Sequence, residues 1–318
     1  MTRITSSLFL ATLLALGLHV ASAEAQLVRT CVSMAKGSDA NSATSCHCTT
    51  PCRTFATAAA NTLADGEITV LDPGDYGGLT ITKSISINND SGGEASITVS
   101  GGTTGIIVNA PNGAGYVNLR GLTIQGVGFG GGTGLVFNTG FALTMENCVV
   151  RNHTGNGISF FPSASSNLSV SNTLVADNGQ NGISVIPSGS GTVKAVFTRV
   201  EAYNNSFSGI LVNGQGSTGT VNATAADSVA GNNSSAGFRV NSASAATSLL
   251  LDRSVAVNNG TGLAANGATA TLRVGQSTVT GNTTSWAATS SAFLRSYADN
   301  NIDGNFDADP APMTIATK

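Results

Sequence analysis

Short segments in which apolar and polar residues alternate recur along most of the chain, from about residue 66 to residue 309. A period of two indicates a β-strand that buries one face and exposes the other. No segment between these strands has the length or the 3.6-residue period of a crossover helix. The clearest of the strands are Leu143-x-Met145, Leu168-x-Val170, Val193-x-Ala195-x-Phe197, Leu249-x-Leu251 and Leu272-x-Val274.

A second signal follows these strands at a nearly constant interval. An Asn recurs every 24 to 27 residues, in most repeats three positions after a Val, and a small and an apolar residue follow it. These residues are Asn152, Asn178, Asn205, Asn232, Asn258 and Asn282. We expect their amides to point inward at a bend and to hydrogen-bond from one repeat to the next. Repeats that each hold three short strands can stack only as coils, so the pattern predicts an all-β, single-stranded parallel β-helix, a three-sheet solenoid.

The first coil of such a solenoid exposes an unpaired strand edge, which invites aggregation unless another element covers it. Residues 50–64 have the features of a short covering helix. Thr50 can cap its N-terminus, and Pro51 suits its first position. Its apolar face repeats at Phe55, Ala59 and Leu63. We therefore predict an N-terminal capping helix.

The chain resembles the pectate-lyase-like superfamily of right-handed β-helix proteins over about residues 50–309. The resemblance lies in the coils with Asn at their bends and in the run Gly66-Glu67-Ile68-Thr69-Val70-Leu71-Asp72-Pro73-Gly74-Asp75-Tyr76. It implies a right-handed coil. In enzymes of the superfamily, one outer face carries clustered carboxylates, often with calcium, and a Lys, Arg or Asp as base or acid. Because its members include lyases, hydrolases, tailspikes and surface proteins, the resemblance implies no single reaction.

The chain begins with the features of a secretory signal peptide at residues 1–25, where an apolar run from Leu8 to Val20 precedes small residues. We divide the rest into a cysteine-containing cap at 26–65, the β-helix at 66–309 and a tail at 310–318. No later segment approaches the roughly 20 apolar residues of a membrane helix. We expect a secreted, periplasmic or cell-surface protein whose mature part has no membrane span.

Composition narrows the choice of partner. Charged residues make up 10% of the chain, and its net charge of -3 provides no basic surface for nucleic acid. Aromatic residues make up 5%, which is low for a protein that stacks sugars on exposed rings.

Four of the five cysteines lie close together, at Cys31, Cys46, Cys48 and Cys52. In an exported protein they can form two disulfides, and three pairings are open. His47 offers a zinc site as the alternative, although the two-residue spacer of a metal knuckle is missing. Cys148 lies inside a predicted strand, and we interpret it as a small buried side chain.

The outer faces of the strands offer few groups for catalysis. A Gly-apolar pair begins one strand of each coil, and each of these strands has one outward residue. In successive coils these residues are Val136, Ser159, Ser184, Leu211, Arg239 and Ala264, of which only Arg239 is charged. The preceding strands place Glu146, Lys194, Asp252 and Arg273 outward. Asp252 and Arg273 lie on neighbouring coils and predict a surface ion pair, with a catalytic role as the alternative. These four residues and Arg239 are the candidate binding residues, and we assign no catalytic residue.

His153 lies in the bend Asn152-His153-Thr154-Gly155, and we interpret it as a solvated turn residue. A role as general acid or base is the alternative, but the sequence places no carboxylate beside it. Neither a Gly-His-Gly motif nor an Asn-Thr-Asp motif of the polygalacturonase type occurs in the chain.

The densest acidic segment is residues 299–310, which resembles a calcium loop. It has Gly304 at the sixth position, but its twelfth residue is Pro310 instead of the bidentate Glu. The possible ligands are Asp299, Asn301, Asp303 and Asp307. The segment predicts either a structural calcium or a last coil whose Asn residues continue the ladder and whose acids face water. We predict no other cofactor.

The leading hypothesis is an exported, non-catalytic β-helix that presents a polar surface to polysaccharide or to a cell-surface component. One alternative is a lyase or glycoside hydrolase acting on uronic-acid polymers. A second alternative is a structural surface protein that associates with itself.

Overall fold

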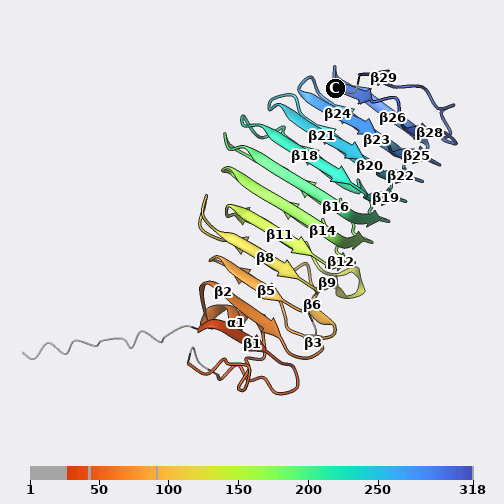
Figure 1. Cartoon of the computed structure of the whole chain (residues 1–318). Coiled ribbons are helices and arrows are strands. Elements are labelled where there is room, and N and C mark those ends of the chain that lie inside the picture. The colour runs from red at the N-terminus through yellow and green to blue at the C-terminus, as the bar shows by residue number, and fades with distance from the viewer. Residues whose placement is uncertain (1–26, 42–43, 91, 317–318) are drawn as a thin grey trace, which may run out of the picture.

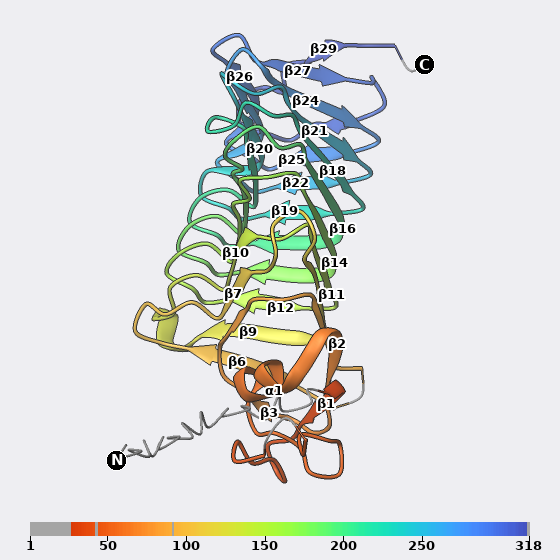
Figure 2. The same cartoon turned by 90° about the vertical axis from the view of Figure 1, so that its left-hand side faces the viewer.

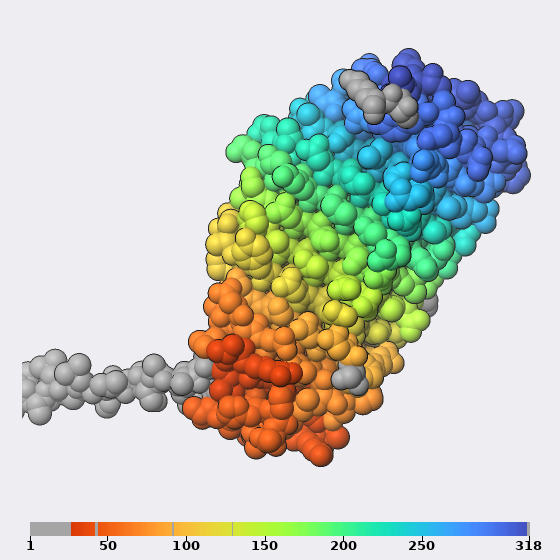
Figure 3. All heavy atoms as spheres, viewed as in Figure 1, coloured from red at the N-terminus to blue at the C-terminus, as the bar shows by residue number. Residues whose placement is uncertain are grey.

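The computed structural model describes residues 27–41, 44–90 and 92–316, and the predicted signal peptide lies outside them. The chain winds in successive coils into one elongated body, whose N-terminal and C-terminal parts lie at opposite ends (Figure 1 and Figure 3). Within the described residues, 29 strands accompany one α-helix and one 3-10 turn. The predicted all-β parallel solenoid is confirmed.

Each strand pairs in parallel with the strand one coil away, and three sheets enclose a shared core (Figure 2). Sheet 1 contains β1 (Leu27–Val32), β2 (Thr62–Val70), β5 (Ile85–Asn88), β8 (Tyr116–Arg120), β11 (Ala142–Glu146), β18 (Val221–Ala226), β21 (Thr247–Asp252), β24 (Ala270–Gly275), β27 (Phe293–Ser296) and β29 (Met313–Thr314). Sheet 2 contains β3 (Gly74–Asp75), β6 (Ala95–Val99), β9 (Leu122–Gly126), β12 (Val149–Arg151), β19 (Val229–Gly231), β22 (Val255–Val257), β25 (Thr278–Thr280) and β28 (Asn301–Ile302). The long strands β14 (Ser166–Ala176) and β16 (Val193–Tyr203) begin in sheet 1 and end in sheet 2. Sheet 3 contains β4 (Leu79–Ile81), β7 (Ile106–Asn109), β10 (Leu135–Thr139), β13 (Ile158–Phe160), β15 (Ile183–Val185), β17 (Ile210–Asn213), β20 (Ala236–Asn241), β23 (Thr261–Asn266) and β26 (Thr284–Thr289).

Inward side chains stack in rows because the strands pair in register. In sheet 1, Leu143 lies opposite Leu168 on the next coil, and both side chains are almost fully buried. In sheet 3, the rings of Phe137 and Phe160 stack with centroids 4.4 Å apart. The period-two pattern therefore assigned the buried face of these strands correctly.

A ladder of buried side chains runs along the corner between sheet 2 and sheet 3. The amide Nδ2 of each Asn donates to the Oδ1 of the Asn on the next coil at 2.8–3.0 Å. Along most of the ladder this Nδ2 also donates to a backbone carbonyl, so the buried amides are satisfied. In chain order the ladder is His153, Asn178, Asn205, Asn233, Asn259, Asn282 and Asn305.

The ladder predicted from the sequence is wrong in three coils. Asn152, Asn232 and Asn258 each come directly before the ladder residue, and their φ angles are 64°, 56° and 55°. Asn tolerates this left-handed backbone better than most residues. Two adjacent positions of the bend therefore favour Asn for different reasons, and the sequence pattern does not separate them.

A second ladder, which the sequence analysis missed, follows the corner between sheet 1 and sheet 2. The backbone N–H of Ser228 donates to the hydroxyl of Ser254 at 3.2 Å, and that of Ser254 donates to Ser277 at 3.0 Å. The residue before each of these serines has positive φ: Asp227, Arg253 and Gln276. One left-handed residue therefore turns the chain from one sheet into the next.

The capping helix begins later than predicted. Helix α1 spans Phe55–Asn61, and Thr54, rather than Thr50, accepts the capping hydrogen bond from the N–H of Thr57. Thr50 and Pro51 stay outside the helix because the neighbouring Cys52 bridges to β1 through its backbone. Leu63, expected on the helix, lies on β2 and is 38% exposed.

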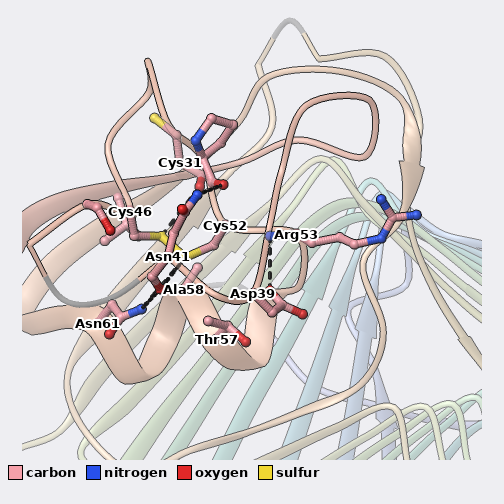
Figure 4. The surroundings of a disulfide bond; sticks show 12 residues. Cys31, Asp39, Asn41, Cys46, Cys52, Arg53, Thr57, Ala58 and Asn61 are labelled. Atoms are coloured by element: carbon pink, nitrogen blue, oxygen red, sulfur yellow. Dashed lines mark hydrogen bonds between the residues drawn. A yellow bond between two sulfur atoms is a disulfide. The ribbon is translucent and has the colours of Figure 1, made fainter.

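Two disulfides, Cys31–Cys48 and Cys46–Cys52, fasten the cap to strand β1 and to the residues before α1. Figure 4 shows this region, where Asn61 donates to the carbonyl of Asn41 at 3.2 Å. The four paired cysteines leave no thiolate for the zinc alternative. Strand β1 pairs with β2, so the solenoid begins one strand earlier than residue 66.

The segment expected as a C-terminal tail contributes to the fold. Strand β29 pairs in parallel with β27 and extends sheet 1 by one strand. The indole N–H of Trp286 donates to the carbonyl of Pro310 at 2.6 Å. The β-helix therefore ends beyond residue 309.

We expect the variant Asn233→Ala to lower the free energy of unfolding by about 1 to 3 kcal/mol, because the N–H and amide of Asn205 lose their acceptor. The matched control is Asn232→Gly, since glycine also adopts the positive φ of that position. Urea denaturation measures both variants. Equal losses in the two variants would contradict a ladder that runs through Asn233.

Candidate functional site

The outward row predicted for sheet 3 is in register from Val136 to Ala264. Most of this row is covered, since Ser159 and Ser184 are 1% and 0% exposed. Arg239 donates through Nη1 to the Ser235 hydroxyl at 3.3 Å, and its buried Nε has no partner in the described part of the chain. This row therefore offers one guanidinium and no carboxylate for chemistry.

The candidates Glu146 and Lys194 on sheet 1 are not brought together. Glu146 lies 3.7 Å from the guanidinium of Arg120, which also pairs with Asp90 at 2.8 Å. Lys194 is exposed two coils further on, and its neighbours in register are Asn167 and Asn222. No shared site forms from these two residues.

The expected ion pair between Asp252 and Arg273 is wrong. Asp252 instead pairs with its sequence neighbour Arg253, which also lies 2.9 Å from Asp227 on the preceding coil. Arg273 lies opposite Leu250 and Arg295 in sheet 1. Arg253 has a left-handed backbone conformation at the corner, and its side chain turns toward Asp252. The sequence pattern had assigned Arg273 to this carboxylate.

Asp252, Arg253, Arg273 and Arg295 line a groove of about 850 Å³ beside the last coils, which we call the arginine groove. Its polar lining consists of Asp252, Arg253, Arg273, Gln276, Arg295, Tyr297 and Asp299. Sequence reasoning found Asp252, Arg273 and Asp299 but missed the other four. Successive ladder residues in these last coils are 23 residues apart. Arg295 lies 22 residues after Arg273, so the coil length could have predicted that the two arginines are neighbours.

The groove contains both paired and unpaired charges. Arg253 is paired with Asp252 in the groove and with Asp227 beside it, and its hydrogen bonding and attraction lower the pKa of Asp227. Asp299 accepts a hydrogen bond from the backbone N–H of Gln276 at 3.1 Å. Among the described residues, no carboxylate pairs with Arg273 or Arg295, and the guanidinium of Arg295 lies 4.8 Å from the ring centroid of Phe293. The groove thus presents two guanidinium groups with free hydrogen-bond donors.

A family model described as "Right handed beta helix region" matches residues 104–306. The chain belongs to this β-helix family. The match confirms the right-handed coil that the resemblance implied. No curated protein matches this β-helix chain in sequence.

Among solved structures, this β-helix is similar to pectate lyase Pel9A, with 15% identity and a TM-score of 0.51. The match covers 92% of this chain and 78% of that chain, and it shows a shared fold. The Azotobacter vinelandii mannuronan C-5 epimerase AlgE4 A-module matches with 15% identity and a TM-score of 0.39, over 80% of this chain and 91% of that chain.

The acidic segment of this β-helix closes its last coil. Asn305 continues the ladder, while Asp307 accepts from the N–H and hydroxyl of Ser285 at 2.9 Å and Asp309 accepts from Gly304 and Asn305. In the described ranges, no group of three or more His, Cys, Asp and Glu residues is placed to hold a metal ion. Structural calcium at Asp299, Asn301, Asp303 and Asp307 stays a prediction.

His153 is buried at the head of the ladder, so the interpretation as a solvated turn residue is wrong. Its Nε2 lies 3.2 Å from the carbonyl of Ile124, and its Nδ1 has no partner in the described part of the chain. Burial lowers the pKa of this imidazole. Cys148 is buried as predicted, and burial raises the pKa of its thiol to about 11. Neither side chain reaches the arginine groove.

We expect stability to fall as the pH drops below about 6.5, the pKa of an unfolded histidine. Below that pH the unfolded chain binds a proton that the buried His153 does not bind. Between about pH 6.5 and the lowered pKa of the folded protein, each unit by which the pH falls therefore lowers the free energy of unfolding by at most about 1.4 kcal/mol. The variant His153→Asn should remove this slope and join the Asn ladder. Melting temperatures from pH 7.5 down to pH 5.5 measure the effect, and an unchanged slope in the variant would contradict it.

Proposed function

We propose that this β-helix protein binds an anionic polysaccharide of the uronic-acid type in the arginine groove, without cleaving it. The observation that carries this proposal is the pair Arg273 and Arg295, which lie on neighbouring coils without carboxylate partners among the described residues. Within the described residues, no helix is long and apolar enough to cross a membrane. The two disulfides support a location in an oxidising compartment outside the cytoplasm.

The chemistry of the groove suits carboxylates on a sugar chain. Guanidinium groups bind carboxylates through two parallel hydrogen bonds, which are stronger than neutral ones. Arg273 and Arg295 are separated by one coil, about 4.8 Å along the axis. Tyr297 lines the same groove, and its ring can pack on the apolar face of a sugar.

The partners of the carboxylates favour binding over catalysis. A general acid or base needs a carboxyl group that is free to exchange protons with the substrate. Asp252 is held by Arg253, and Asp299 accepts from Gln276. The resemblance implies that an enzyme's basic residue lies among clustered carboxylates, whereas Arg273 and Arg295 have no carboxylate partner in the described part of the chain. The likeness to a pectate lyase concerns the fold, and one fold carries many functions.

We expect the double variant Arg273→Gln, Arg295→Gln to bind polyuronate about 10 to 100 times more weakly than the native protein. This loss corresponds to about 1.4 to 2.8 kcal/mol for the two arginines together, because pairs of charged groups that are open to solvent contribute about 0.2 to 1 kcal/mol each and hydrogen bonds to charged groups about 1.5 to 3 kcal/mol. Isothermal titration calorimetry with a polyuronate and a neutral polysaccharide measures the difference. The matched control is Arg151→Gln, an exposed arginine on sheet 2 that donates to Gln125.

Equal polyuronate binding by the double variant and the native protein would contradict the proposed site. The same mixtures are followed by ultraviolet absorbance and by assay of reducing ends. New unsaturated ends would identify a lyase, and reducing ends without absorbance would identify a hydrolase. Either product would refute the non-catalytic part of the proposal.

A further inference from the structure

We infer that the outer face of sheet 1 is a continuous track for one long, linear anionic polysaccharide that lies along the axis of the β-helix. This inference rests on the proposed function and extends it from the arginine groove to the N-terminal half of the solenoid. It assigns the partner as a polymer instead of a short oligosaccharide.

Two outward rows of side chains form this track, and the register of the strands sets their order. The first row is Tyr116, Ala142, Asn167, Lys194, Asn222, Ser248, Thr271 and Phe293. The second row is Asn118, Thr144, Ser169, Val196, Thr224, Leu250, Arg273 and Arg295. All sixteen side chains are at least partly exposed. The strands that carry them lie side by side along the body in Figure 1.

The charges on the track differ from those of the whole chain. The chain has a net charge of -3, whereas the two rows hold Lys194, Arg273 and Arg295 and no acidic residue. The nearby carboxylate of Glu146 lies beside Arg120, and that of Asp252 beside Arg253. A polyanion on this face therefore meets unpaired cations and little repulsion.

The remaining positions provide contacts that suit sugars. Asn, Ser and Thr side chains offer hydrogen-bond donors and acceptors along the middle of both rows, and short side chains leave room for a polymer. At the N-terminal end, Tyr116 is 50% exposed and its ring lies 5.2 Å from that of Phe141. At the other end, Phe293 is 45% exposed beside Arg295.

Seven coil steps of about 4.8 Å separate the two aromatic ends, so the track is roughly 34 Å long. A short oligosaccharide in the arginine groove cannot reach Lys194 or Tyr116. Only an extended chain touches all three regions at once. The length of the ligand therefore distinguishes the track from the groove alone.

The test uses calorimetry with two discrete oligouronates, one that fills only the arginine groove and one longer than roughly 34 Å. We expect the long oligomer to bind about tenfold more tightly at one oligomer per protein. A long chain also offers more ways to occupy a single site, so tighter binding alone does not demonstrate the track. Variants at the far end of the track distinguish the two explanations. We expect Tyr116→Ala and Lys194→Gln each to weaken binding of the long oligomer severalfold and to leave the short one unchanged. Phe207→Ala, at a 52% exposed ring outside the track, is the matched control.

The outcomes separate this inference from the proposed function. If Arg273→Gln, Arg295→Gln weakens binding of both oligomers while Tyr116→Ala and Lys194→Gln change neither, the track is refuted and the groove stands. If neither oligomer binds the native protein, both proposals are refuted. Loss of long-oligomer binding in Phe207→Ala to the same degree as in Tyr116→Ala would also refute the track.

Discussion

The hydrogen-bonded ladders inside the corners are the constraint on which the rest of this β-helix depends. Each buried Asn amide accepts from the preceding coil and donates to the following one, which fixes the relative height and rotation of neighbouring coils. A slip of one residue would turn every side chain of a strand to the opposite face. Because the ladder prevents such a slip, Arg273 and Arg295 come to lie side by side on the outer face.

In this architecture, interior residues stabilise the fold and different residues, on the outer surface, are available to bind a ligand. Apolar rows and satisfied amides stabilise the interior, so the outward positions of sheet 1 are free to vary with little effect on the fold. The two outward rows of sheet 1 hold Lys194, Arg273 and Arg295 and no acidic residue, although the chain has a net charge of -3. His153 takes the place of an Asn at the head of the ladder, and because burial lowers the pKa of its imidazole we expect the fold to lose stability in acid.

Local patterns in the sequence predicted the coils and their buried faces, because a period of two depends only on neighbouring residues. The same patterns gave wrong predictions where a contact with a residue distant in sequence determines the local structure. Cys52, tied to β1, delays the start of the helix, and the left-handed corner at Arg253 changes the partner of Asp252. The arginine groove was only partly predictable, because it requires the spacing between coils as well as the sequence within each coil.

The most direct test of the central claim is a crystal structure of the protein with an acidic oligosaccharide longer than the track. We predict that the sugar chain lies along sheet 1, with its carboxylates within hydrogen-bonding distance of Arg273 and Arg295. A sugar chain bound on the outer face of sheet 3, over Ser159 and Ser184, would contradict the assignment of the binding surface.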